Sequence, residues 1–172
     1  MKSLILSIAS LALAAAGLAA EPARRLDKAN VLPLALSDDF SFRKTKTYYY
    51  DPRDPAQRQQ TFNQMLQFER QRLQFGAITQ VDRRERYGTY FTFYWRAKRL
   101  ADVRVRLEFR TKNLGSYVQA RDVEYTAAKG TLKAEFAITG DDYEQDGGIT
   151  AWRAVVIEGG KIVALNQSFL WN

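Results

Sequence analysis

The stretch Val103–Arg110, VRVRLEFR, alternates apolar and charged side chains without a break. Successive side chains of a β-strand point to opposite faces of the sheet, so this alternation predicts a strand with one buried face and one charged face. The period of two returns on both sides of this stretch. The chain is therefore expected to be mainly β.

Further strand patterns follow one another with short turns between them. The pair Gly159-Gly160 is a strong hairpin signal, because glycine tolerates positive φ at both central positions of a tight turn. Short connections require antiparallel pairing of the strands that they join. About seven strands are expected, at Phe40–Tyr50, Gly88–Ala97, Val103–Arg110, Tyr117–Tyr125, Leu132–Ile138, Ile149–Ile157 and Lys161–Trp171.

The sequence predicts one amphipathic helix, at about residues 55–75. Asp54 suits the N-cap, and Pro55 suits the first helical position, where its missing N–H is not needed. Gln57 lies at the third helical position, as in a capping box, and Gly76 provides a C-terminal stop. Apolar residues recur on one side of this segment, which predicts an amphipathic helix that either covers a sheet edge or fills part of the core.

These elements favour an antiparallel β-sandwich of immunoglobulin-like architecture with one early helix. The alternative is an α+β fold, in which the helix packs across one curved antiparallel sheet. Apolar residues make up 46% of the chain and aromatic residues 13%, which is enough for a substantial core. We expect one globular domain at residues 39–172, preceded by a loose leader at residues 21–38.

Residues 1–20 have the pattern of a secretory signal of bacterial style. Lys2 provides the basic start, an apolar run follows over Leu4–Leu18, and small residues lead to an expected cleavage site after Ala20. The expected product is periplasmic or secreted. No later apolar run is long enough to cross a bilayer as a helix, so no transmembrane segment is expected in the mature chain.

The chain contains no histidine and no cysteine. Their absence excludes serine–histidine and cysteine–histidine catalysis, thiolate nucleophiles and imidazole zinc sites. The sequence also lacks a glycine-rich phosphate-binding loop. No catalytic residue is therefore assigned, and a non-catalytic binding role is favoured.

The formal net charge of +7 suits either solubility or attraction to acidic partners. Arg104, Arg106 and Arg110 share the charged face of the alternating strand, where guanidinium groups suit bidentate contacts to an acidic glycan or a phosphate. Specific nucleic-acid binding is not expected. The alternative role of these arginines is structural, in cross-strand ion pairs with carboxylates such as Glu124 and Glu135.

A second candidate binding group is the run Tyr48, Tyr49 and Tyr50. Exposed tyrosines beside arginines suit stacking on a sugar or contact with another protein. Neighbouring residues of a strand face opposite sides, so the three rings are not expected on one face. The alternative is that these tyrosines pack under the helix.

The acidic loop at residues 141–148 is the best candidate for a metal site. Asp142, Glu144 and Asp146 alternate before a glycine, as in the first half of a calcium loop, and hard carboxylate oxygens suit Ca²⁺. The twelfth position holds Arg153 where such a loop needs a bidentate glutamate. The alternative is a polar hairpin loop with no ligand.

The favoured function is a non-catalytic binding or interaction module of the bacterial cell envelope or secretome, with a protein or an acidic glycan as its ligand. The first alternative is a carboxylate-dependent hydrolase or a calcium-dependent module that uses the acidic loop. The second is a small outer-membrane β-barrel, which the strand alternation permits.

Overall fold

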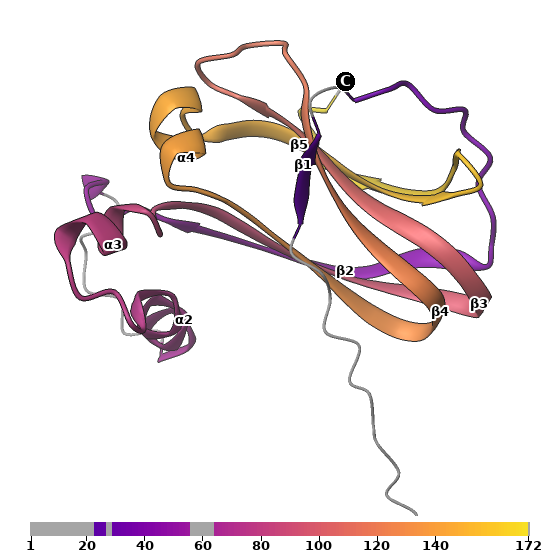
Figure 1. Cartoon of the computed structure of the whole chain (residues 1–172), viewed down its shortest axis with the longest axis horizontal. Coiled ribbons are helices and arrows are strands. Elements are labelled where there is room, and N and C mark those ends of the chain that lie inside the picture. The colour runs from indigo at the N-terminus through magenta and orange to yellow at the C-terminus, as the bar shows by residue number, and fades with distance from the viewer. Residues whose placement is uncertain (1–22, 27–28, 56–63, 172) are drawn as a thin grey trace, which may run out of the picture.

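The computed structural model describes residues 23–26, 29–55 and 64–171 (Figure 1). The expected signal at residues 1–20, its cleavage after Ala20 and the capping residue Gln57 lie outside these ranges. The described strands form one open antiparallel sheet of six strands, accompanied by three short helices. The strands are β1 (Arg24–Leu26), β2 (Phe40–Tyr50), β3 (Gly88–Thr111), β4 (Gln119–Thr139), β5 (Ile149–Glu158) and β6 (Lys161–Gln167), and the helices are α2 (Gln64–Gln74), α3 (Gln80–Arg84) and α4 (Asp141–Asp146).

Two long strands, β3 and β4, form the spine of the sheet. They have 24 and 21 residues, and each replaces two shorter strands expected from the sequence. The strands expected at Tyr117–Tyr125 and Leu132–Ile138 are continuous, because Gly130, with a φ of 85°, pairs with Ala97 inside the ladder. Register shifts between Ala97 and Val103 let both strands bend and continue.

One edge of β3 is shared by two partners. β2 pairs with its first half, Gly88 to Ala97, and β5 pairs with its second half, Arg104 to Thr111. Because β3 and β4 run through both halves, the two halves belong to one sheet. The mainly β, antiparallel expectation is confirmed, whereas the described residues do not show the two separate sheets of a sandwich. The single antiparallel sheet agrees with that part of the alternative expectation.

The core lies on one face of the coiled sheet. Phe91, Phe93 and Trp95 from the first half of β3 and Val105 and Leu107 from the second half are each at most 1% exposed. The alternating stretch thus buries the apolar face that its pattern predicts. Each side chain of this size stabilises the fold by roughly 1.5–3 kcal/mol when it leaves water.

Several local features agree with the sequence. β2 has the bounds expected for it, and α2 confirms a helix over Gln64–Gln74. The Gly159-Gly160 turn joins β5 to β6, with φ of 54° and 75°. No helix in the described part of the chain has the length and apolar content that crossing a membrane requires.

Two segments lie against parts of the opposite face of the sheet, called the outer face here. α2 lies over the first half and contributes Leu73, which is 8% exposed. Residues 29–37, called the strap, run over the second half, where Leu32 packs against Ile157 and Ile162. The strap pairs in parallel with β6 at Leu34↔Ile162. The positions of α2 and the strap therefore determine which of the candidate arginines and tyrosines are exposed to solvent.

Candidate functional site

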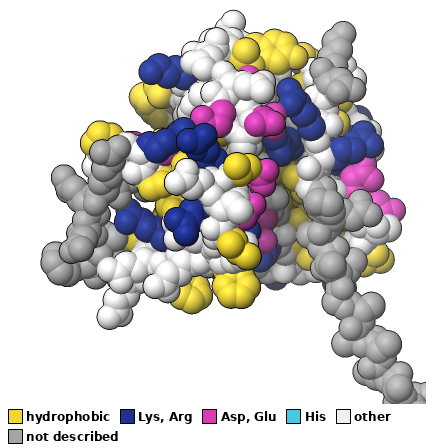
Figure 2. All heavy atoms as spheres, turned by 60° about the vertical axis from the view of Figure 1, so that its left-hand side comes forward, with side chains coloured by type: hydrophobic (Ala, Val, Ile, Leu, Met, Phe, Trp, Pro, Cys, Tyr) yellow, Lys and Arg dark blue, Asp and Glu magenta, His cyan; other side chains and the backbone are white. Residues whose placement is uncertain are grey.

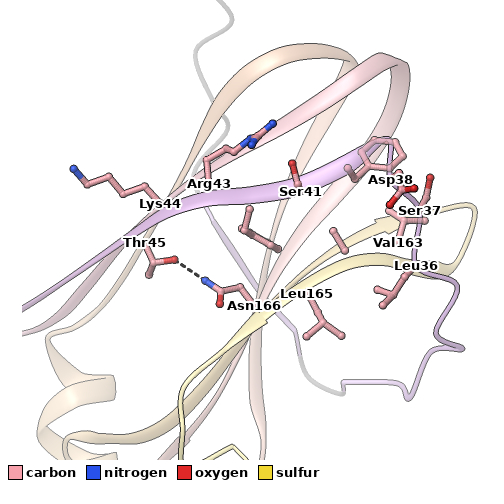
Figure 3. A pocket seen from close by; sticks show the side chains of 13 residues that line it. Leu36, Ser37, Asp38, Ser41, Arg43, Lys44, Thr45, Val163, Leu165 and Asn166 are labelled. Atoms are coloured by element: carbon pink, nitrogen blue, oxygen red, sulfur yellow. Dashed lines mark hydrogen bonds between the residues drawn. The ribbon is translucent and has the colours of Figure 1, made fainter.

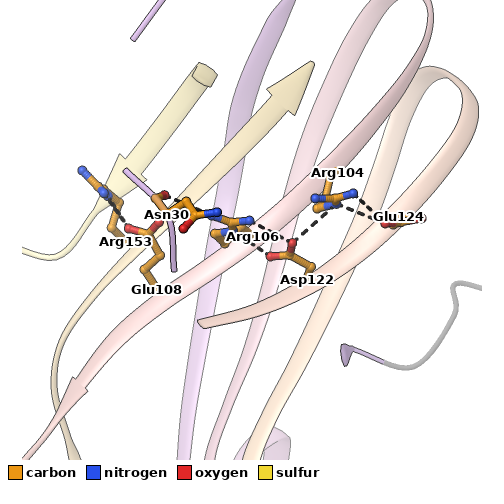
Figure 4. A network of polar contacts seen from close by, with 7 residues as sticks. All are labelled: Asn30, Arg104, Arg106, Glu108, Asp122, Glu124 and Arg153. Carbon is orange, nitrogen blue, oxygen red and sulfur yellow. Dashed lines mark hydrogen bonds and ion pairs between the residues drawn. The ribbon is translucent and has the colours of Figure 1, made fainter. Parts of the chain in front are cut away.

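Two of the three candidate arginines, Arg104 and Arg106, lie on the outer face of β3 within a row of ion pairs (Figure 4). Arg106 donates from Nε and Nη2 to the two carboxylate oxygens of Asp122, at 2.8 and 3.1 Å. The Arg106 and Asp122 side chains are only 6% and 4% exposed. Arg104 pairs with Glu124 at 2.8 Å, as the structural alternative predicts, whereas Glu135 pairs with Lys133 at 3.0 Å.

The same row continues on the β5 side. Arg153 pairs with Glu108 at 2.5 Å, and the guanidinium groups of Arg110 and Arg153 lie 4.8 and 5.2 Å from the centre of the Trp171 ring. Arg106 also lies under the strap, with Nη1 3.5 Å from the carbonyl oxygen of Asn30. The row links strands to one another and to the strap. A ligand-binding role for Arg104, Arg106 and Arg110 stays a prediction.

The three tyrosines are divided between the faces of β2. Tyr48 and Tyr50 lie toward α2, where Tyr50 hydrogen-bonds to Gln74 and is 3% exposed. Tyr49 lies on the other face, and its hydroxyl is 2.7 Å from the hydroxyl of Tyr143. Burial raises the pKa of Tyr48 and of Tyr50 above the ordinary value. Two of the three tyrosines therefore lie under the helix, as the structural alternative predicts.

The acidic loop forms the short helix α4, and its carboxylates point to different partners. Asp142 pairs with Arg25 at 2.7 Å and also with Arg121. Glu144 pairs with Arg53 at 2.7 Å, and Asp146 accepts a hydrogen bond of 2.6 Å from Gln119. Within the described ranges, no three acidic side chains gather as metal ligands would. The arrangement gives the calcium prediction no support and instead ties α4 to three other parts of the chain.

Asp51 and Tyr143 form a polar node beside α4. The Tyr143 hydroxyl donates to Asp51 at 2.9 Å, and Arg53 donates to the same carboxylate at 2.9 and 2.8 Å. Burial raises the pKa of Asp51, but the hydrogen bonds from Arg53 and Tyr143 outweigh burial and lower it overall. Burial and hydrogen bonds to Tyr49 and Asp51 raise the pKa of Tyr143. At neutral pH the node is an ionised Asp51 carboxylate held by the neutral Tyr143 hydroxyl and the Arg53 guanidinium.

A groove of about 780 Å³ lies between β2 and β6 (Figure 3). Consecutive residues line it on both sides, from Phe40 to Thr45 on β2 and from Val163 to Asn166 on β6. Side chains of a strand alternate between faces, so a cavity lined by consecutive residues borders the backbone edge of the strand. The groove is therefore a space between two strand edges.

Along this groove, neither edge has a strand partner among the described residues. β2 pairs only with β3, and β6 is the last strand of its side of the sheet. The strap occupies the outer edge of β6 only as far as Val163, whose carbonyl accepts a hydrogen bond of 2.9 Å from the Ser37 N–H. Beyond Val163 the edge of β6 continues through Ala164 and Leu165. Such edges present backbone N–H and C=O groups to any strand that approaches.

Both ends of the groove are closed. At one end the strap turns into β2, and at the other Asn166 Nδ2 donates to Thr45 Oγ1 at 2.8 Å. Arg43 and Lys44 are exposed, and Figure 3 shows their side chains extending away from β2. Leu165, on the opposite side, is 37% exposed. The groove thus combines backbone edges, some apolar surface and a basic rim.

The residues that line this groove were not identified from the sequence. Arg43 and Lys44 sit in a strand pattern like any other, and Leu165 reads as a core residue. A local signal for a groove is missing because its two sides are 118 or more residues apart in the chain and meet only through the coiling of the sheet. The structure shows one irregularity in the wall of the groove, a register shift between Phe42 and Lys44 in the pairing of β2 with β3, and the sequence alone does not reveal it.

No protein-family model, no curated protein and no solved structure matches this chain.

Proposed function

We propose that this chain is a non-catalytic, exported binding module, periplasmic or secreted, and that the groove between β2 and β6 holds an extended polypeptide segment of its partner. The observation that carries the proposal is the lining of the groove by consecutive residues of two strands. Open strand edges bind extended peptides by adding a strand, with main-chain hydrogen bonds for affinity and side-chain contacts for specificity.

The strap provides an internal precedent for this mode of binding. It is an extended segment that pairs with the outer edge of β6, through Ala35 N–H to the Ile162 carbonyl at 2.8 Å and Ile162 N–H to the Pro33 carbonyl at 2.9 Å. Where the strap turns away after Ser37, the same edge continues into the groove. A ligand strand that follows this edge extends a pairing that the chain already makes.

The chemistry of the rim indicates which peptide fits. Arg43 and Lys44 favour a segment with acidic residues, and Leu36 and Leu165, 63% and 37% exposed, favour apolar side chains between them. The wall from Phe40 to Thr45 is roughly 17 Å long, at about 3.3 Å per residue, so it accommodates about five ligand residues. Exposed charges on a strand edge also discourage two copies of the same edge from pairing.

The test is binding of a short fluorescein-labelled peptide with alternating valine and glutamate residues, followed by fluorescence anisotropy. We expect saturable binding to the wild-type protein and loss of binding in the double variant Arg43→Glu/Lys44→Glu. The matched control is Lys112→Glu/Lys161→Glu, which makes the same charge change away from the groove. Equal loss of binding in both double variants, or no saturable binding to the wild-type protein, contradicts the proposal.

A second measurement locates the peptide independently of charge. Hydrogen exchange followed by mass spectrometry reports protection of backbone amides, and a bound strand protects the amides of the edges that it pairs with. We expect added protection in the segments that contain Ser41–Thr45 and Ala164–Asn166. Protection confined to other segments would place the peptide elsewhere on the protein.

A second candidate ligand is an acidic glycan, and one cleft favours it. Tyr48, Tyr90 and Tyr94 line a cleft of about 540 Å³ between α2 and the outer face, together with Lys46 and Lys133. Tyrosine rings stack on sugars, and lysines attract carboxylates. Slower migration through gels that contain polygalacturonate, relieved by Tyr94→Ala but not by Arg43→Glu/Lys44→Glu, would favour this cleft.

A further inference from the structure

The segment from Gln64 to Tyr87, called the arm, comprises α2, α3 and the corner between them, and it projects from one end of the sheet (Figure 1). Its attachment is thin. Among the described side chains of the arm, Leu73 alone is buried, and α3 contains no buried residue. Arg86 Nη1 donates to the Leu73 carbonyl at 2.6 Å, which fastens α3 to the end of α2.

The arm exposes large apolar side chains around its corner. Phe75 and Ile78 are 86% and 85% exposed, and Phe68 and Val81 are 63% and 64% exposed. Side chains of this kind normally enter a core or an interface, and a group of them at a projecting corner marks a surface for interaction. The sheet offers these four residues no cover.

Basic residues accompany this apolar corner. Arg83 and Arg84 are exposed and follow Val81 and Asp82 on α3. The carboxylate of Asp82 accepts hydrogen bonds from the backbone N–H groups of Ile78 and Thr79, and the described residues place no carboxylate in ion-pair contact with Arg83 or Arg84. Arg84 lies three residues after Val81, so both belong to the same side of the helix. Figure 2 shows this end of the molecule, with hydrophobic side chains at the surface among Lys and Arg and with Asp and Glu beside them.

We infer that the corner of the arm binds the surface of an anionic phospholipid bilayer. Apolar side chains of short amphipathic elements enter the boundary between headgroups and acyl chains, and flanking arginines bind the anionic headgroups. The corner is a projection, and a fluid interface accommodates a projection without a matching pocket. The net charge of +7 adds attraction at longer range.

The test is co-sedimentation with vesicles, using purified protein that begins at Glu21, which lacks the apolar run of residues 4–18. Vesicles of phosphatidylcholine with phosphatidylglycerol are compared with vesicles of phosphatidylcholine alone at the same salt concentration. We expect partition into the anionic vesicles to be at least roughly tenfold stronger. Equal partition into both kinds of vesicle would overturn the inference.

Two variants and a control assign the binding to the arm. Phe75→Ser/Ile78→Ser removes the apolar contact, and Arg83→Glu/Arg84→Glu reverses the charge; each is expected to weaken anionic binding by at least roughly tenfold. Phe169→Ser/Leu170→Ser removes two apolar side chains that are 93% and 64% exposed at another place and is expected to bind like the wild type. Unchanged binding in both arm variants would also overturn the inference.

A labelled cysteine reports insertion directly, since the chain has no other cysteine. Phe75→Cys carries an environment-sensitive fluorophore at the corner, and Phe169→Cys carries it at the control position. We expect the emission of the Phe75 label alone to shift to the blue and increase on anionic vesicles. Sedimentation without this shift would mean that another surface binds the lipid, and circular dichroism confirms that each variant is folded.

Discussion

Arg106 and Asp122 stand directly opposite each other on β3 and β4 and are joined by two hydrogen bonds in a place almost closed to water. The pair lies under the strap, beside the apolar contacts of Leu32. Removal of one charge from a buried ion pair destabilises the fold, because the other charge stays buried without a partner. Replacement of both charges by apolar residues of similar size changes stability much less. This asymmetry makes the pair open to a direct test.

Replacement of one member of this pair is expected to destabilise the fold strongly. Arg106→Met leaves the Asp122 carboxylate buried without its main partner, at a cost of about 3–5 kcal/mol in the free energy of unfolding. The double variant Arg106→Met/Asp122→Leu is expected to recover most of that loss. Urea denaturation of the three proteins measures both effects. A single variant within about 1 kcal/mol of wild type would show that water reaches the pair.

Stability is expected to depend on Asp51 in acid. The folded protein holds the pKa of Asp51 below the ordinary value of 3.8, so the stabilisation is complete above that value and is lost as the pH falls through the folded pKa. We expect the free energy of unfolding to fall as the pH drops below 3.8 and through the lowered pKa of Asp51, and to fall less in Asp51→Asn. Asp38→Asn, at an exposed carboxyl, is the control. Identical pH profiles for wild type and Asp51→Asn would contradict the role assigned to the node.

Gly88 is expected to tolerate no side chain. Its φ is 148°, and a methyl group on its Cα would collide with the carbonyl oxygen of Ile138 on the neighbouring strand. Gly88→Ala should therefore lower the free energy of unfolding by at least about 2 kcal/mol. Gly115→Ala is a useful comparison, because Gly115 also has positive φ, at 60°, but has open space around it. Thermal unfolding of both variants distinguishes the two effects, since Gly115→Ala reports the cost of positive φ alone and Gly88→Ala adds the collision with Ile138.

Trp171 is expected to stabilise the fold although it lies at the end of the described chain. It is 7% exposed and lies close to the guanidinium groups of Arg110 and Arg153. Trp171→Ala should cost about 3 kcal/mol, from lost burial and lost cation–π contacts. Phe169→Ala, at a side chain that is 93% exposed, should change stability by less than about 0.5 kcal/mol. Equal effects in denaturant titrations would contradict the assignment.

Sequence patterns predicted those strands and turns whose formation is determined by residues close together in the chain. The alternation in Val103–Arg110 identified a strand and its buried face, and Gly159-Gly160 identified a hairpin, because each depends only on side-chain period or on allowed φ. β2 was predicted with its full bounds for the same reason. The short helix α4 was not predicted, since its stability comes from ion pairs with Arg25, Arg53 and Arg121, which are distant in the sequence.

The arrangement of the strands depends on contacts between residues far apart in the chain, which the sequence pattern does not reveal. Gly130 is a turn signal by composition, yet the pairing of β3 with β4 extends through it and joins pairs of expected strands into long ones. The alternation identified Arg106 as lying on the charged face, but not the strap that covers this face. The groove between β2 and β6 is likewise a product of topology.

The pairing of the strap with β6 also sets an order of events during synthesis. The strap is among the first parts of the described chain to leave the ribosome, and β6 is the last strand to do so. The outer face over Arg106 is therefore completed only when translation is nearly finished, because contacts between distant segments wait for both to be present. Until then the nascent chain lacks the contact that closes this face of the sheet.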